Sequence, residues 1–165
     1  MHLAGAALPA LPHAKVLPQL SRRRDAQAPA SLMGGVPPPR AISVVAAVIE
    51  REGKILITRR PAGSHLAGLW EFPGGKSQPG ESDREALARE LREELGVSAT
   101  VGEPVEVVEW RYPDIHVRIE FFRCAIDGEP RPLEGQEMAW VAPAELDRYE
   151  FPPADAVLLE RLRRS

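Results

Sequence analysis

The sequence predicts an α/β (α+β) layered domain in which a mixed β-sheet lies between helices. Two observations predict it: β-branched, strand-like runs stand on both sides of one well-capped helical segment, and a second amphipathic segment closes the chain. Such segments bury their apolar faces by stacking as layers around one sheet. The 165 residues suffice for one domain, which we place at residues 41–165.

Residues 1–40 differ in composition from the rest of the chain. They hold seven of the 17 prolines, and Asp25 is their one acidic residue against five lysines and arginines. No helical or strand period survives so many prolines, so we expect a disordered tail. One alternative is that translation starts at Met33. Another is an organellar transit peptide, because such peptides are rich in arginine and poor in acidic residues.

The first ordered segments are expected to form a β-hairpin. Residues 42–49 (ISVVAAVI) are almost continuously apolar and β-branched, as in a strand that is buried on both faces. Glu52 and Gly53 provide a turn, and residues 54–58 (KILIT) return as the second strand. The segments that follow are a loop at residues 61–69 and a glycine-rich loop at residues 73–75.

The next segment carries the clearest helix signals of the chain. Ser82 followed by Glu85 forms a capping box, and Gly96 directly after Leu95 is a C-cap signal. Leucines at every fourth position form the buried stripe of this helix: Leu87, Leu91 and Leu95. The sequence therefore predicts a helix with defined ends, entered from the glycine-rich loop.

The remaining segments complete the sheet and add the second helix. We expect extended segments at residues 105–110, 116–126 and 138–141, a brief helix from Pro143 and a final helix over residues 154–163. The apolar residues Val157, Leu158 and Leu162 mark the inner face of that final helix.

Composition excludes several functional classes. The net charge of −3 gives no support for stable nucleic-acid or membrane binding, which a basic excess would favour. The single cysteine, Cys124, excludes an internal disulfide framework and fits a reducing compartment, so we expect a cytoplasmic protein. Its place in an apolar strand predicts a buried packing residue.

Three glutamates of the predicted helix, Glu90, Glu93 and Glu94, share one face at positions i, i+3 and i+4. Their arc adjoins the leucine stripe, so we expect them to be half sheltered. Stacked like charges destabilise a helix by a few tenths of a kcal/mol per pair unless something neutralises them. A divalent cation would do so, and oxygen ligands suit magnesium and manganese. The alternative is a solvated helix face held by ion pairs with Arg89 and Arg92.

Residues 75–97 (GKSQPGESDREALARELREELGV) resemble the Nudix box of the Nudix hydrolases, with every defined position filled. The resemblance extends from residue 42 to residue 162 and includes ITRRP, WEFPGGK, LEGQE and FPPAD. It is closest to the MutT-type nucleoside triphosphate pyrophosphohydrolases. The resemblance implies a Nudix-type layered fold and substitution at the β-phosphorus, which releases a nucleoside monophosphate and pyrophosphate.

The resemblance also implies a metal and catalytic site. The expected ligands of Mg²⁺, or of Mn²⁺ as a substitute, are Glu90, Glu93, Glu94, Glu134 from a distal loop and the main-chain carbonyl of Gly74. Glu93 or Glu134 is the expected general base. Arg89 is expected to orient a glutamate by a charge-assisted hydrogen bond, and Glu81 to support the loop or a second ion.

A nucleotide pocket is implied by matches outside the box. The expected substrate-binding residues are Arg60, His65, Glu71, Phe72, Pro73, Gly74 and Asp155. Arg60 and His65 could instead be surface bystanders, Asp155 could serve only as a partner of the helix dipole, and Tyr112 and Trp110 could stack on a base but would more often be core.

Asp155 stands where the guanine-reading member of the family has asparagine. An amide donates and accepts hydrogen bonds, which suits the O6 and protonated N7 of 8-oxoguanine, whereas an ionised carboxylate only accepts. We therefore expect 8-oxo-dGTP hydrolysis for sanitation of the nucleotide pool, with CTP or a modified dCTP as the competing substrate. If burial raised the pKa of Asp155, the protonated acid could donate as asparagine does.

Other functions fit the sequence less well. A Nudix hydrolase of ADP-ribose or a dinucleoside polyphosphate would carry further signatures that we do not find. A non-catalytic module that recognises 8-oxoguanine would have lost the box glutamates, and this chain keeps them all. We expect a monomer or weak dimer that acts on a small nucleotide.

Overall fold

The computed structural model describes residues 15–16, 41–113 and 115–165. The elements in chain order are β1 (Lys15–Val16), β2 (Ala41–Arg51), β3 (Lys54–Arg59), β4 (Trp70–Glu71), β5 (Gly74–Lys76), α1 (Asp83–Leu95), β6 (Ser98–Arg111), β7 (His116–Asp127), β8 (Met138–Val141), the 3-10 helices η1 (Pro143–Arg148) and η2 (Pro153–Asp155), and α2 (Ala156–Arg163).

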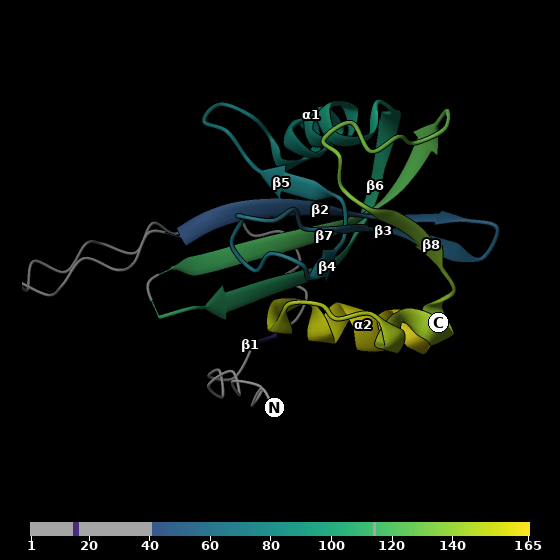
Figure 1. Ribbon diagram of the computed structural model, residues 1–165. Coiled ribbons are helices and arrows are strands. Elements are labelled where there is room, and N and C mark those ends of the chain that lie inside the picture. The colour runs from purple at the N-terminus through teal and green to yellow at the C-terminus, as the bar shows by residue number, and fades with distance from the viewer. Residues whose placement is uncertain (1–14, 17–40, 114) are drawn as a thin grey trace, which may run out of the picture.

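A mixed sheet forms the middle layer (Figure 1). Its strands follow the order β1-β6-β7-β2-β3-β4, with β5 paired to β2 and β8 to β3. The central pair, β2 and β7, is parallel, and the other pairs are antiparallel. Because β2 also pairs with β3 and β5, it connects the two halves of the sheet.

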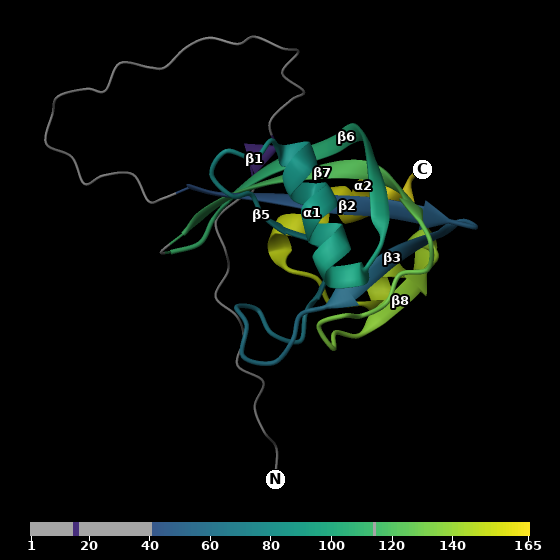
Figure 2. The ribbon, with the colours of Figure 1, turned by 90° about the horizontal axis from the view of Figure 1, so that it is seen from above.

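Helices cover both faces of the sheet, which confirms the predicted layers. Figure 1 shows α1 on one face and α2 on the other, and Figure 2, seen from above, shows α1 lying across the sheet. Two cores result. The first holds the leucine stripe of α1, and the second holds Leu158 and Leu162 of α2, whereas Val157 is only half-buried. The predicted burial of Cys124 is confirmed, at 5% exposure.

The local signals for the hairpin and the long helix are confirmed. Glu52 and Gly53 connect β2 to β3 with φ values of 52° and 73°, as a two-residue turn of the primed type requires. The Ser82 side chain accepts from the Glu85 N–H, and the Glu85 side chain accepts from the Ser82 N–H. Gly96 closes α1 in the left-handed conformation.

The expected glycine-rich loop is instead the short strand β5. A Cβ on Gly74 would lie 2.0 Å from the main-chain oxygen of Val45, so only glycine lets this segment approach β2 closely enough to pair. The final helix also differs from the prediction. Residues 153–155 form a 3-10 turn and α2 begins at Ala156, because Pro152 and Pro153 shape this entry.

Most of residues 1–40 lies outside the described residues, so the tail that we predict to be disordered falls outside the part of the chain that the structure describes. The exception is β1, a two-residue strand that we did not expect from the sequence. Its main chain pairs with the edge of β6, with Lys15 opposite Glu109 and Val16 opposite Val108. Within the described residues no helix has the length and apolar character that crossing a membrane demands.

Candidate active site

The three glutamates of α1 differ in exposure because they lie at different angles from its leucine stripe. Glu94 is next to the stripe and Glu90 follows it, and both are half-buried. Glu93 points about 100° away from Glu94, and about 60° beyond Glu90, and is exposed, with 54% of its side chain accessible. The expectation of half-sheltered side chains therefore holds for Glu90 and Glu94 and is wrong for Glu93.

Strand β5 lies directly against these carboxylates. A Cβ on Gly75 would fall 2.3 Å from the carboxyl carbon of Glu90, so this position has room for hydrogen alone while the Glu90 side chain keeps its present conformation. The Gly74 N–H donates to Glu94 Oε2 at 3.3 Å. Gly74 thus contacts Glu94 through its N–H, and a metal-binding role for the Gly74 carbonyl stays a prediction.

Glu94 sits in the most negative surroundings of the helix. Burial first, and then the charges of Glu71, Glu90 and Glu134 in that order, together raise its pKa to about 8, although the hydrogen bond from Gly74 lowers it. Burial is also the main reason why the pKa of Glu90 is raised, with Glu93 and Glu134 adding to it. These five carboxylates, which we call the carboxylate cluster, come from β4, α1 and the loop before β8.

Arg89 partly offsets this charge. Its guanidinium donates to Glu81, to Glu90 Oε1 at 3.1 Å and to Glu93 Oε2 at 3.1 Å, and it also donates to the main-chain oxygen of Lys76 at 3.2 Å. Arg89 therefore contacts three glutamates and β5 at once. This arrangement suits the orienting role expected from the sequence, and it places Glu81 in support of Arg89.

The carboxylate cluster has the donor chemistry of a hard divalent cation. As the side chains stand, residues 41–113 and 115–165 contain no group of three acidic, histidine or cysteine side chains that already converges on one point. The contacts explain why: oxygens of Glu90 and Glu93 face Arg89, and one oxygen of Glu94 faces the Gly74 N–H. The raised pKa of Glu94 shows that like charges crowd this site, and the missing Cβ of Gly75 leaves space beside the Glu90 carboxylate. Both features fit a cation that would draw these oxygens together.

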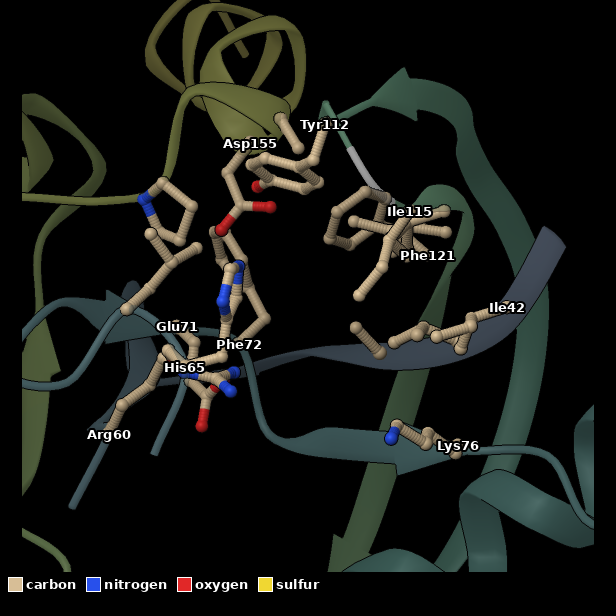
Figure 3. A pocket seen from close by; sticks show the side chains of 17 residues that line it. Ile42, Arg60, His65, Glu71, Phe72, Lys76, Tyr112, Ile115, Phe121 and Asp155 are labelled. Atoms are coloured by element: carbon tan, nitrogen blue, oxygen red, sulfur yellow. The ribbon is translucent and has the colours of Figure 1, made fainter. Parts of the chain in front are cut away.

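A cavity of about 230 Å³ lies on the α2 side of the sheet, and Glu71 of the carboxylate cluster is part of its wall (Figure 3). Its walls are mostly apolar and come from β2, β7, the loop at residues 61–69 and the segment before α2. The polar residues on its wall include Arg60, His65, Glu71, Lys76 and Asp155. Cavities with apolar walls and a few polar groups are typical of small-molecule sites.

Arg60 and Glu71 form an ion pair at the wall of this cavity. Arg60 Nη1 donates to Glu71 Oε2 at 2.6 Å, and Arg60 Nε donates to the main-chain oxygen of His65 at 2.6 Å. The pair therefore ties β4 to the loop that carries His65. Burial raises the pKa of Glu71 while Arg60 lowers it, and the charge of Glu134 raises it again.

Asp155 points into the cavity from the segment before α2, next to Tyr112 (Figure 3). It is 5% exposed, and burial together with the charge of Glu71 raises its pKa to about 8, against an opposing effect of Arg60. Asp155 stands at the N-cap position of α2, but its side chain makes no capping hydrogen bond. At neutral pH it is therefore mainly a neutral acid that can donate one hydrogen bond and accept others.

The structure brings most of the sequence-predicted pocket residues together. Arg60, His65, Glu71, Phe72 and Asp155 all line the cavity. Pro73 and Gly74 do not: the Pro73 carbonyl accepts from the Ala47 N–H at 2.8 Å, and Gly74 lies on the cluster side of β5.

Sequence reasoning missed Lys76 and left Tyr112 undecided. Lys76 follows the two glycines, and its side chain lines the cavity. Tyr112 also lines it, with its ring edge-on to His65 at 5.4 Å between centroids, whereas Trp110 is core at 6% exposure. The strand alternation puts both aromatics on one face, and the position of Tyr112 at the strand end could have indicated the difference.

Comparison with known proteins adds independent information. The family model described as NUDIX domain matches residues 44–161. The chain is 47% identical to the CTP pyrophosphohydrolase of Escherichia coli, over 73% of this chain and 90% of that protein. It is 42% identical to an 8-oxo-dGTP diphosphatase of Haemophilus influenzae, over 74% and 92% respectively. The crystal structure of a MutT protein from Methanosarcina mazei superposes with a TM-score of 0.70, at 30% identity over 78% of this chain and 97% of the other.

Proposed function

We propose, from the premise that this chain belongs to the Nudix family as a MutT-type hydrolase of phosphoric anhydrides, that it converts 8-oxo-dGTP to the monophosphate and pyrophosphate. The family and the reaction class follow from the matches over most of the chain. The identity of the base and the roles of single residues are the new part of the proposal.

The observation that carries the proposal is that Glu71 belongs both to the wall of the cavity and to the carboxylate cluster. Its side chain lines the cavity and pairs with Arg60, and its charge also acts on Glu94 and on Asp155. The cavity and the carboxylate cluster are therefore contiguous. A base in the cavity would leave its triphosphate running past Lys76 and Gly75, which are consecutive on β5, toward Glu90 and Glu94.

The proposal assigns metal binding, proton transfer and the positioning of glutamates to different residues. Nudix hydrolases need a divalent metal ion. Glu90, Glu93, Glu94, Glu134 and the Gly74 carbonyl would hold Mg²⁺, which would supply positive charge to offset charge that develops on the phosphates. Glu93 or Glu134, both exposed to solvent, would take the proton from the attacking water. Arg89 would hold Glu90 and Glu93 in place, and Lys76 would face the phosphates.

Asp155 supports 8-oxoguanine as the base. With its pKa raised to about 8, Asp155 carries a proton at neutral pH and resembles the asparagine of the guanine-reading relatives. One carboxyl oxygen would accept from the N7 hydrogen of 8-oxoguanine, and the protonated oxygen would donate to O6. Phe72, stacked on Phe151 with an interplanar angle of 29°, forms part of the apolar wall that the base would contact.

CTP, or a modified dCTP, is the second candidate. The observation that favours it is the 47% identity to a protein named CTP pyrophosphohydrolase, which exceeds the 42% identity to an 8-oxo-dGTP diphosphatase. Ionised Asp155 would accept a hydrogen bond from the N4 amine of cytosine. The O6 of 8-oxoguanine therefore requires the protonated form of Asp155, whereas the N4 amine of cytosine does not depend on that proton.

The deciding experiment is a substrate panel with Mg²⁺, in which pyrophosphate release is measured for 8-oxo-dGTP, dGTP, CTP, 5-methyl-dCTP and 2-oxo-dATP. The proposal requires the highest kcat/KM for 8-oxo-dGTP. A higher value for CTP or 5-methyl-dCTP would replace it by the second candidate. No pyrophosphate from any of them would rule out both and leave a Nudix hydrolase of another substrate class or a binding module. The cytoplasmic location and the monomeric or weakly dimeric state remain predictions.

A further inference from the structure

The loop that carries Glu134 lies on the C-terminal end of α1. The Arg131 N–H donates to the main-chain oxygen of Leu95 at 3.0 Å, and the Leu133 N–H donates to that of Glu94 at 3.0 Å. The last carbonyls of a helix have no partner inside it, so this loop supplies the partners that α1 needs. The helix with the box glutamates and the loop with the distal glutamate are therefore directly joined.

Gln136 adds a side-chain link between the same two segments. Its Nε2 donates to the main-chain oxygen of Glu94 at 3.0 Å, and its Oε1 accepts from the main-chain N–H of Glu134 at 2.9 Å. Gln136 is 9% exposed, and both bonds are partly buried. A primary amide is the neutral side chain group that can donate and accept at once in this geometry.

The main chain around Gln136 is well anchored. The next residue, Glu137, accepts from the Arg59 N–H at 3.0 Å, and Met138 then pairs with Thr58 as β8 joins β3. Glu134 itself is exposed and lies beside Gly135, which has a φ of 71°. An exposed side chain in such a loop takes its position from the anchoring of its main chain.

We propose that Gln136 is a positioning residue that holds Glu134 against the glutamates of α1. The inference rests on the proposed function, because it gives Glu134 a role in turnover. The amide of Gln136 spans the main chains of Glu94 and Glu134, so it fixes the distance between one glutamate of the helix and the glutamate of the loop. The charge of Glu134 acts on Glu71, Glu90 and Glu94, so its carboxylate is within electrostatic range of the other four.

The contacts predict a specific effect of removing the amide. Gln136→Met keeps the size of the side chain and removes both bonds. The Glu94 carbonyl keeps the Leu133 N–H as a donor, so the protein should stay folded with a Tm lower by about 2–4 °C. Misplacement of a catalytic group by about 1 Å costs up to about 100-fold in rate, so we expect kcat to fall about 10- to 100-fold with little change in KM.

A double-mutant cycle separates positioning from a general structural effect. The four proteins are the parent, Gln136→Met, Glu134→Gln and the double variant, with Gln78→Met as a surface control of the same chemical change. If Gln136 acts through Glu134, adding Gln136→Met to Glu134→Gln should change kcat by less than about twofold. An equal loss of rate in both backgrounds would overturn the inference, and so would a Gln136→Met protein with the parental kcat.

Amide hydrogen exchange of the metal-free protein, followed by NMR, provides a readout that does not depend on activity. The Glu134 N–H should lose its protection in Gln136→Met and keep it in Gln78→Met. Unchanged protection of Glu134 would overturn the anchoring role. A parent that releases no pyrophosphate from any nucleotide would instead overturn the proposed function together with the role in turnover, while the exchange data would still decide whether Gln136 anchors Glu134.

Discussion

Glu71 and Asp155 line the same cavity, and the charge of Glu71 is the largest effect after burial that raises the pKa of Asp155. The Glu71 carboxylate, which is ion-paired with Arg60, thus helps to keep the Asp155 carboxyl group protonated. This relationship makes the choice of base sensitive to pH in a direction that can be worked out.

Selectivity should change as Asp155 ionises. Below its pKa of about 8 the protonated acid suits 8-oxoguanine, and above it the carboxylate suits the N4 amine of cytosine. The ratio of kcat/KM for 8-oxo-dGTP to that for CTP should therefore fall between about pH 6.5 and about pH 9. Asp155→Asn cannot ionise and should keep a constant ratio. A parental ratio that is as flat as that of the variant would exclude Asp155 as the discriminating group.

The same ionisation should cost stability. The pKa of Asp155 rises from an ordinary 3.8 to about 8 on folding, so its contribution is fully present at low pH and is lost as the pH rises through about 8. Urea unfolding with EDTA should therefore show Asp155→Asn gaining free energy of unfolding relative to the parent between about pH 5 and about pH 9. A constant difference between the two proteins across that range would contradict the raised pKa.

Glu94→Gln should separate activity from stability. Loss of one expected metal ligand should lower kcat/KM by more than about 100-fold. Burial and like charges disfavour the ionised form of Glu94, so the neutral amide should make the metal-free protein more stable at about pH 8.5. Glu103→Gln, an exposed change on β6, is the matched control and should alter neither quantity. A Glu94→Gln protein with near-parental turnover would remove Glu94 from the metal site.

The two glycines of β5 should respond differently to alanine. A Cβ at position 74 meets the main chain of β2, which cannot move aside, so Gly74→Ala should lower the free energy of unfolding by about 3 kcal/mol or more. A Cβ at position 75 meets the carboxylate of Glu90, which can rotate away. Gly75→Ala should therefore fold nearly normally and lose most of its activity. Equal effects of both variants on stability, measured by urea unfolding, would refute this distinction.

The parts of this molecule that the sequence predicts well depend on local chemistry. Ser82, Glu85 and Gly96 set the ends of α1 through bonds within a few residues, and the i, i+3, i+4 spacing places Glu90 and Glu94 on one face. The hairpin turn at Glu52 and Gly53 is equally local. Such features need no knowledge of the tertiary contacts.

The parts that sequence reasoning missed depend on packing across the fold. Gly74, Gly75 and Lys76 have low strand propensity and become β5 because the missing Cβ of Gly74 lets the segment pair with β2. The pKa of Asp155 depends on its burial and on Glu71, which lies more than eighty residues away in the chain. The link through Gln136 likewise joins residues 42 positions apart.

No residue of α1 lines the cavity, although α1 carries three of the carboxylates proposed for the chemistry. The cavity draws on β2, β4, β5, β7, two loops and the segment before α2. Only β4 and β5 also carry residues of the carboxylate cluster or contacts to α1, so we expect changes elsewhere on the wall to leave the helix in place. A library restricted to Ile42, His65, Tyr112, Ile115 and Asp155 should therefore yield hydrolases for new bases that retain pyrophosphate as their product. Because the cavity and the α1 carboxylates are separate parts of the fold, gene duplicates of such a protein could change their substrate and keep the same reaction.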